Sequence, residues 1–334
     1  MVTLKNISEK TGFSVSTISR LLNNDLTLSV TEDTKNIILT AALDLGYPKE
    51  KIKLSIYDIS VYYWVTDIEE LHDTYFRELR LHLSENSEKH NMKLHYISKN
   101  EGIKKSIKGA DSFIAIGSFS KEEVTYLNKK YSYGVFLESN VLSEKFDTVN
   151  PDLDWITKNA INLMLSAGHK NIGLICGGYF EPDSNMKILD RRESAFRQYL
   201  STFGLLKEEN IYTGGKFSVE TGHKLGQKIV ENNTLKSLPT AFFVASDPIA
   251  VGVLQVFNEN KIHVPSNTNL ISINDINIAK YISPSLSTYH IDRFALANTA
   301  ILLLKDQREN PRPFNKTVYV GANFIERESF KPRK

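Results

Sequence analysis

The sequence lacks the features of secreted, membrane-spanning and disulfide-bonded proteins. One cysteine, Cys176, stands among 334 residues, which excludes a disulfide framework and a cysteine-ligated zinc site. Apolar runs such as Ala300–Leu304 are far shorter than the roughly 20 residues that a membrane span requires. The first residues show no basic-then-apolar region of an export signal. We therefore expect a cytoplasmic protein without a membrane segment.

The motifs of common catalytic and cofactor sites are also missing. The sequence contains no G-x-S-x-G, H-E-x-x-H, G-x-G-x-x-G or G-x-x-x-x-G-K-[S/T] segment. Its 8 histidines are scattered, a pattern that indicates no metal site. Gly177 and Gly178 follow a predicted strand without the Lys-Ser/Thr of a phosphate loop, so we interpret them as a tight turn. We expect no catalytic residues, no metal ion and no cofactor.

Composition and length fit a soluble globular protein of more than one domain. Hydrophobic residues make up 41% and charged residues 24% of the chain, and 334 residues suit two or three domains. The net charge is only +2, from 41 basic and 39 acidic residues. If nucleic acid is a partner, its contact with the chain has to be local.

Residues 1–46 are predicted to form a small helical domain of their own, here called the headpiece. Thr3 caps a first helix that ends at Gly12, and Ser14 caps a second helix that runs to about Asn23. A third helix is predicted to complete the domain. A tight glycine-containing turn between two short helices is typical of the helix-turn-helix motif, whose second helix lies in the DNA major groove.

The predicted second helix has an apolar and a polar side. Steps of 100° place the apolar residues broadly together: Val15, Ile18, Leu21 and Leu22. The same steps place the polar residues opposite them: Ser16, Thr17, Arg20 and Asn23. Arginine forks onto guanine and the other polar side chains bond bases or phosphates, while Val15 is placed to touch a thymine methyl group. A helical cap whose polar face meets water is the alternative. Charge leaves both open, because residues 1–50 carry five basic and six acidic residues, although the ratio is three to one up to Asn23.

The segment from Val2 to Asn23 resembles the headpiece of the LacI/GalR (lactose-repressor/galactose-repressor) family of transcription factors. The resemblance implies that Val15, Ser16 and Arg20 read bases. It also implies that Ser14, Thr17 and Asn23 contact the DNA backbone. We add Thr3 to the DNA-contacting set, and we expect double-stranded operator DNA as a partner.

Residues 47–58 are predicted to link the headpiece to the rest of the chain. In the family this segment forms a hinge helix in the dimer, and its leucine enters the minor groove. Tyr47–Ile56 matches that pattern poorly, and Leu54 is the candidate wedge. The lysines within Lys49–Lys53 fit phosphate contacts or a solvated linker equally well.

Residues 59–334 alternate buried strands with amphipathic helices, which predicts an α/β core of two doubly wound parallel sheets. Strands are expected at 59–65, 93–97, 112–117, 134–138, 172–176, 210–212, 241–245 and 269–274. Helices are expected near 187–203, 218–232 and 248–260. This core resembles the periplasmic-binding-protein-like core of the same family through Ala167–Ile175, Phe243–Val253, Ile271–Asp275 and Pro284–Thr288. The resemblance implies three crossings between lobes, with a first lobe of about 59–150 and 292–316 and a second of about 151–291 and 317–334.

The resemblance also implies a set of effector-binding residues in the cleft. Arg192 matches a family arginine that forks onto sugar hydroxyls, and Ser246 stands at a position where an amide residue often contacts the effector. Glu138 matches an acidic position in the cleft. Phe217 matches an aromatic residue that stacks on the effector, and Tyr75 is a further aromatic candidate. Asn274 stands where the family usually has an aspartate. The structural alternatives are a surface salt bridge for Arg192, a helix cap for Ser246, an ion pair for Glu138 and core packing for the two aromatics.

These observations predict a transcriptional regulator, with repression favoured over activation, that binds a near-palindromic operator as a homodimer. Its effector is expected to be a small sugar-like molecule. The segments Leu22–Ser29 and Ser272–Asp275 resemble the galactoside-responsive branch of the family, which implies a galactoside. No leucine heptad follows Phe330, so a dimer is preferred to a tetramer. A sugar-binding protein of transport and a sugar or nucleotide enzyme on a doubly wound fold are the rival hypotheses.

Overall fold

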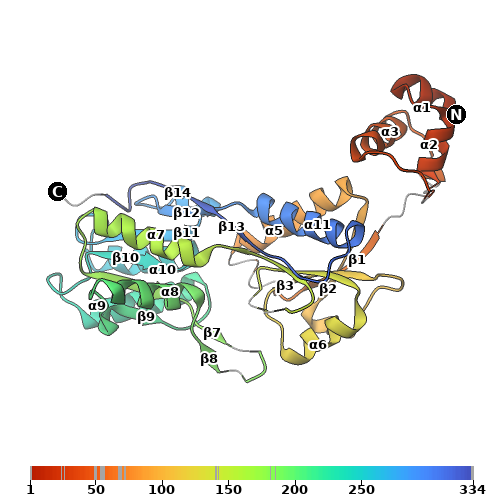
Figure 1. The fold of residues 1–334 in the computed structure, drawn as a ribbon. Coiled ribbons are helices and arrows are strands. Elements are labelled where there is room, and N and C mark those ends of the chain that lie inside the picture. Colours follow the sequence, from red (N-terminus) through yellow and green to blue (C-terminus); the bar gives the residue numbers. More distant parts are fainter. Residues whose placement is uncertain are drawn as a thin grey trace. The chain divides into compact units, whose positions relative to one another are not determined.

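The computed structural model describes residues 2–23, 25, 27–48, 51–52, 57–66, 70, 73–139, 141, 143–180, 182–184 and 186–331. The chain divides into two compact units (Figure 1). One contains residues 1–58 with 88–93, and the other contains residues 59–87 with 94–334. Each unit is considered by itself below. Within the described residues, no helix is both long and apolar enough to cross a bilayer.

The headpiece consists of α1 (Leu4–Thr11), α2 (Val15–Leu22) and α3 (Glu32–Asp44). Gly12 ends α1 in the left-handed conformation, with φ of +78°, where a residue without Cβ is favoured. Two residues later the Ser14 hydroxyl accepts the backbone N–H of Thr17 at 3.0 Å and caps α2. These two end signals produce the short turn that the sequence predicts.

Apolar residues from all three helices fill the interior of the headpiece. The fully buried set is Ile7, Ile18, Leu21, Leu22, Ile38, Ala41 and Ala42. Burying one leucine or isoleucine contributes roughly 1.5–3 kcal/mol, which makes this small core the main stabilising term of the domain. Val15 is not part of it, because its side chain is 43% exposed. The expectation that Val15 shares the apolar side of α2 is therefore wrong.

The first lobe is built on a sheet with the strand order β13-β5-β4-β3-β1-β2. Its strands are β1 (Tyr57–Tyr63), β2 (Met92–Ser98), β3 (Ser112–Ile116), β4 (Tyr133–Leu137), β5 (Asp147–Pro151) and β13 (Thr317–Val320). The β1–β3, β3–β4, β4–β5 and β5–β13 pairs are parallel. Helices α5 (Thr74–Lys89) and α11 (Arg293–Glu309) lie side by side against it, with α6 (Lys121–Lys130) elsewhere on the lobe (Figure 1).

The second lobe is built on a sheet with the strand order β14-β12-β11-β10-β6-β9. Its strands are β6 (Ile172–Cys176), β9 (Ile211–Thr213), β10 (Ala241–Val244), β11 (Asn269–Asn274), β12 (Ser287–Ile291) and β14 (Ala322–Ile325). Its helices are α7 (Leu153–Ser166), α8 (Arg191–Thr202), α9 (Val219–Asn232) and α10 (Asp247–Glu259). A hairpin of β7 (Tyr179–Phe180) and β8 (Lys187–Ile188) precedes α8. The second lobe also contains the short 3-10 helices η3 (Glu208–Asn210) and η4 (Asn277–Lys280), and η2 (Lys99–Glu101) follows β2 in the first lobe.

The structure differs from the prediction at two edge strands, one in each sheet, and at the start of α8. Strand β14 pairs with β12 in the antiparallel direction, so the sheet is mixed and not wholly parallel. Strand β13 pairs with β5, which places 317–320 in the first lobe and moves the final crossing beyond the predicted boundary at 317. The helix expected from residue 187 begins at Arg191, because β8 occupies 187–188.

Two glycines bring α9 and α10 into backbone contact in the second lobe. A Cβ at Gly222 would lie 2.1 Å from the carbonyl oxygen of Ile249, and one at Gly252 would lie 2.0 Å from that of Val219. Such distances leave no room for any side chain. The close approach fixes the first turns of both helices, which follow directly on the candidate site residues Phe217 and Ser246.

Candidate functional site

The exposed side of α2 carries most of the predicted DNA-contacting residues. Ser16, Arg20 and Asn23 are exposed, and so is Val15 at the start of the helix. Ile18 lies on the opposite, buried side of the same helix. The packed side therefore orients an outward row of one apolar and three polar side chains, which is the arrangement that groove reading requires.

Arg20 is held by two partners on the following loop. Its Nε lies 2.7 Å from Asp25 Oδ2, and its Nη2 donates to Thr27 Oγ1 at 2.8 Å. The hydrogen bond from Arg20, helped by Thr27, holds the pKa of Asp25 well below its usual value. The guanidinium is thus oriented before any partner arrives. The sequence analysis did not identify Asp25, and its position five residues after Arg20 was the available signal.

The other predicted DNA-contacting residues have roles within the headpiece. Thr3 is exposed, and its backbone N–H and hydroxyl both bond Asn6 Oδ1, at 2.9 and 2.8 Å. The hydroxyls of Ser14 and Thr17 lie 2.8 Å apart at the start of α2. Asn23 Nδ2 donates to the carbonyl oxygen of Ser19 at 2.9 Å. Leu54 lies outside the described residues.

In the first lobe, Tyr75 and Glu138 contact one another beside an aspartate. The Tyr75 hydroxyl donates to Glu138, and Asp73 Oδ1 accepts the Tyr75 backbone N–H at 3.0 Å. Tyr75 and Asp73 are 4% and 9% exposed. Burial raises the pKa of Asp73 to about 6 and that of Glu138 to about 7, and burial followed by Glu138 raises the pKa of Tyr75. These carboxyls therefore titrate near neutrality.

In the second lobe, Arg192 forms a forked ion pair with a neighbouring aspartate. Its Nε and Nη2 reach the two carboxylate oxygens of Asp190 at 2.7 and 2.8 Å, and Nη1 donates to the Ala245 carbonyl at 2.7 Å. Phe217 covers the guanidinium, with 4.4 Å between Arg192 Cζ and the ring centroid. Burial opposes ionisation of both groups, but their attraction raises the pKa of Arg192 and lowers that of Asp190. The expected free fork is thus occupied by Asp190.

Ser246 and Asp247 lie just after the carboxyl end of β10, where α10 begins. Ser246 is the N-cap residue of α10, as the helix-cap alternative expects, but its side chain makes no cap hydrogen bond. Its hydroxyl is buried and is without a hydrogen-bond partner in the described part of the protein. Asp247 accepts the Ile276 N–H at 2.9 Å and the Thr288 hydroxyl at 2.8 Å. Burial raises the pKa of Asp247 to about 7.

Asn274, the last residue of β11 in the second lobe, contacts residues of the first lobe. Its Nδ2 lies 3.4 Å from Asp73 Oδ2, and its carbonyl oxygen accepts Arg293 Nη1 at 2.7 Å. Arg293 also pairs with Glu78 at 3.0 Å and lies over the Tyr75 ring, 5.7 Å from its centroid. Asn274 has φ of +111°, and Glu138 has φ of +52°, conformations that non-glycine residues rarely adopt and that concentrate at functional sites.

The structure therefore brings Tyr75, Glu138 and Asn274 into one chain of contacts, and Arg192 and Phe217 into another. We call the combined set the effector cluster: Asp73, Tyr75, Glu138, Arg192, Phe217, Ser246, Asn274 and Arg293. Asp73 and Arg293 were missed by the sequence analysis. Asp73 directly precedes α5, which begins at Thr74, so its position suggests a cap and gives no sign of its contact with Asn274.

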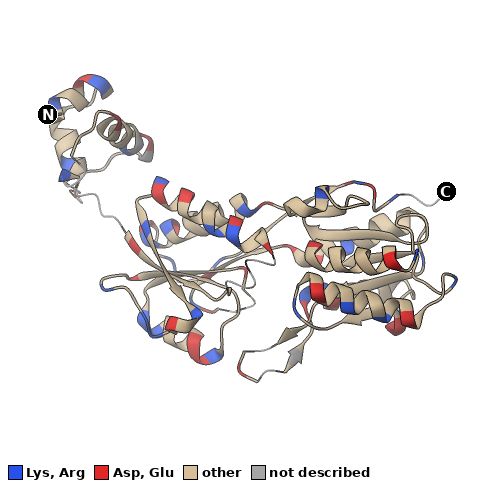
Figure 2. Ribbon diagram, turned by 180° about the vertical axis from the view of Figure 1, so that it is seen from behind, with Lys and Arg blue, Asp and Glu red and all other residues tan. Residues whose placement is uncertain are grey.

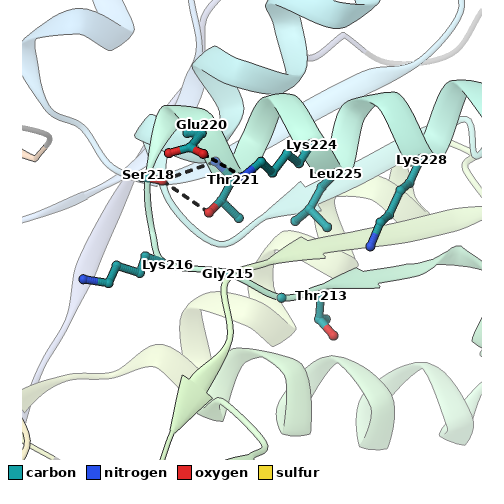
Figure 3. A pocket seen from close by; sticks show the side chains of 10 residues that line it. Thr213, Gly215, Lys216, Ser218, Glu220, Thr221, Lys224, Leu225 and Lys228 are labelled. Atoms are coloured by element: carbon teal, nitrogen blue, oxygen red, sulfur yellow. Dashed lines mark hydrogen bonds and ion pairs between the residues drawn. The ribbon is translucent and has the colours of Figure 1, made fainter.

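A surface pocket lies beside the loop that carries Phe217. It is lined by Thr213, Gly214, Gly215, Lys216, Ser218, Glu220, Thr221, Lys224, Leu225 and Lys228, between α9 and the loop after β9 (Figure 3). None of the predicted site residues lines it, although Phe217 belongs to the same loop. Lysine and glutamate both line the pocket, and Lys224 pairs with Glu220 at 2.6 Å. Basic and acidic residues are both scattered over the ribbon (Figure 2).

Comparisons with known proteins agree with this architecture. A family model described as a periplasmic binding protein-like domain matches residues 161–330. The chain is 41% identical over 330 residues to the HTH-type transcriptional regulator GanR of Bacillus subtilis (strain 168), covering 98% of this chain and 99% of GanR. It is 36% identical over 340 residues to the HTH-type transcriptional regulator LacR of Lactobacillus helveticus, covering 100% of both.

A solved structure shows the same fold. It is a LacI family transcriptional regulator from Enterococcus faecium with bound ribose, with a TM-score of 0.67 at 21% identity, covering 83% of this chain and 100% of that one. A helix-turn-helix headpiece and two α/β lobes define a transcriptional regulator with a periplasmic-binding-protein-like core. The chain belongs to the LacI/GalR family of such regulators. The predicted family and fold class are confirmed.

Proposed function

We propose that the protein represses carbohydrate genes in the cytoplasm by binding operator DNA as a homodimer, under the control of a sugar bound at the effector cluster. The outward row on α2 supports this proposal most directly, because Ile18 is buried in the headpiece while Ser16 and Arg20 are exposed and accessible to DNA. Val15, Ser16 and Arg20 read bases in this proposal, while Thr3, Ser14, Thr17 and Asn23 contact the backbone. Leu54 remains the proposed minor-groove residue.

A sugar suits the chemistry of the effector cluster. The buried carboxyl of Asp73, the half-buried carboxyl of Glu138 and the Asn274 amide offer hydrogen bonds. So does the Ser246 hydroxyl, which has no hydrogen-bond partner among the described residues. Phe217 and Tyr75 offer apolar faces. The structurally similar regulator from Enterococcus faecium holds ribose. We propose a galactoside as the particular effector, and we propose that binding involves no catalytic turnover.

Control follows from the spacing of two headpieces. Two copies fit half-sites only at a fixed separation, so a sugar that prefers one arrangement of the lobes shifts the dimer between DNA-competent and incompetent populations. A coupling of about 1–3 kcal/mol changes operator affinity by roughly 5- to 150-fold. No new contact at the DNA is required for that change.

The test compares DNA from upstream of the protein's own gene with a scrambled duplex of the same length. Fluorescence anisotropy of the full-length protein is expected to show preferential binding of the upstream DNA, with a stoichiometry of one dimer per site. D-galactose or lactose is expected to change that affinity. Equal affinity for both duplexes would overturn the DNA-binding assignment. Recovery of a chemically altered sugar would instead favour the enzyme hypothesis.

A further inference from the structure

A second pocket lies at the end of the second-lobe sheet where β6 and β9 begin. Asn171 directly precedes β6, and Asn210 directly precedes β9. Both strands run parallel to β10, and Ser246 and Phe217 of the effector cluster follow the carboxyl ends of β10 and β9. The pocket therefore lies at the opposite end of the sheet from these two residues. We call it the amide pocket, after the asparagines that line it: Asn171, Asn210, Asn232 and Asn233.

The size and lining of the amide pocket suit a small polar ligand. Its cavity of about 560 Å³ is within the roughly 300–1,000 Å³ of small-molecule sites. Amide side chains each carry a donor and an acceptor, so together they match hydroxyl groups, which also donate and accept. The ligand that fits best is therefore one that carries several hydroxyl groups.

Two buried side chains of the amide pocket have hydrogen-bonding capacity to spare. Asn210 and Tyr212 are 4% and 6% exposed. Asn210 Nδ2 donates to Asn171 Oδ1 at 2.8 Å, and Tyr212 Oη accepts Asn233 Nδ2 at 2.8 Å. Among the described residues, no donor contacts Asn210 Oδ1 and no acceptor takes the Tyr212 hydroxyl proton. Because buried polar groups are nearly always bonded, these two atoms favour a ligand that supplies one donor and one acceptor.

The charged residues of the amide pocket are exposed and uncommitted. Lys207 and Glu209 lie at η3, and Lys236 follows α9. Within the described part of the chain, their side chains have no ion-pair or hydrogen-bond partner. The carboxyl end of α9 contributes roughly half a negative charge. Two lysines outweigh this charge and the single glutamate together, so the balance favours an anion.

Tyr212 is placed to act as a donor beside Glu209. Burial raises the pKa of Tyr212, and the negative charge of Glu209 also raises it. The hydroxyl therefore keeps its proton near neutral pH. The carboxylate of Glu209 accepts hydrogen bonds, so it adds a further acceptor for ligand hydroxyls.

We propose that the amide pocket is a second ligand site, which binds a small anion that carries several hydroxyl groups. Lys207 and Lys236 attract the anionic group, a carboxylate or a phosphate, as point charges. Asn210 Oδ1 accepts and the Tyr212 hydroxyl donates hydrogen bonds to the ligand. The site is separate from the effector cluster, and its occupancy does not depend on DNA.

The experiment measures binding to the full-length protein by isothermal titration calorimetry. D-glucitol, D-gluconate and D-glucitol 6-phosphate share a six-carbon hydroxylated chain and differ in the anionic group, and inorganic phosphate is an anion without that chain. Lys207→Met and Lys236→Met each remove one charge, and Tyr212→Phe removes one hydroxyl. Lys228→Met is the matched control, because Lys228 is an exposed lysine of α9 that lines the pocket of Figure 3 instead.

D-gluconate or D-glucitol 6-phosphate is expected to bind at least about fivefold more tightly than D-glucitol, and the tighter of the two identifies the anionic group. Each variant at Lys207 or Lys236 should weaken that binding by about two- to fivefold, as for one exposed ion pair. Tyr212→Phe should weaken it by about two- to tenfold, as for one hydrogen bond.

Lys228→Met should leave the affinity unchanged. The proposal is overturned if neither hydroxylated anion binds saturably or if D-glucitol binds as tightly as both. It is also overturned if Lys228→Met weakens binding as much as Lys207→Met does. Equal affinity for inorganic phosphate and D-glucitol 6-phosphate would contradict recognition of the hydroxyl groups.

Discussion

Replacing Arg20 with alanine is the sharpest test of how the headpiece reads DNA. In the free protein Arg20 pairs with Asp25, and the two side chains are 43% and 32% exposed. An exposed pair of this kind contributes about 0–1 kcal/mol. A forked contact with guanine contributes about 1–3 kcal/mol of base discrimination, which exceeds the cost of leaving Asp25. The expected loss for Arg20→Ala is therefore about 1–3 kcal/mol on the preferred operator.

Asp25→Asn is the matched control for the same side chain. It removes the competing carboxylate and a negative charge close to the DNA, so we expect affinity to rise by up to about 1 kcal/mol on every sequence. Anisotropy is measured for both variants and the double variant on duplexes that differ at one base pair. Arg20→Ala should lose discrimination at one position only. An equal loss of affinity on all duplexes would refute base reading by Arg20.

Two further predictions concern the core. Asp73 and Glu138 have pKa values raised by burial to about 6 and about 7, so the folded state holds protons that the unfolded chain has released at these pH values. The free energy of unfolding should therefore rise by on the order of 1 kcal/mol as pH falls from about 8 to about 6. Tm measured by calorimetry should rise over the same interval. A Tm that falls instead contradicts the burial argument. Gly252→Ala places a methyl group against the Val219 carbonyl, and we expect urea unfolding to show a loss of about 1–3 kcal/mol; an unchanged midpoint would show that α9 and α10 separate freely.

The local signals of the headpiece made its fold predictable. Gly12 ends α1 through its left-handed φ, and Ser14 begins α2 through a cap bond to Thr17. Both effects depend only on residues close in sequence, so sequence spacing is sufficient to locate the two helix ends. Val15 shows the limit of this approach. Steps of 100° place Val15 near the apolar side of α2, but its side chain, at the first position of the helix, is exposed.

The effector cluster was only partly predictable, because its contacts join distant residues. Family resemblance predicts Arg192 as a site residue, but the fork onto Asp190 depends on side-chain geometry that spacing does not encode. Asp73 and Asn274 are 201 residues apart and approach only through the arrangement of the lobes. Short edge strands such as β13 escaped notice, since Thr317–Val320 is half exposed and lacks a continuous apolar run.

Operator affinity measured in one titration with a neutral sugar tests the central claim most directly. Full-length protein is bound to labelled DNA from upstream of its own gene, and D-galactose or lactose is added while anisotropy is recorded. The account predicts a change of roughly fivefold or more in operator affinity that saturates with the sugar, as expected for coupled sites. Binding that prefers no DNA sequence and responds to neither sugar would contradict it.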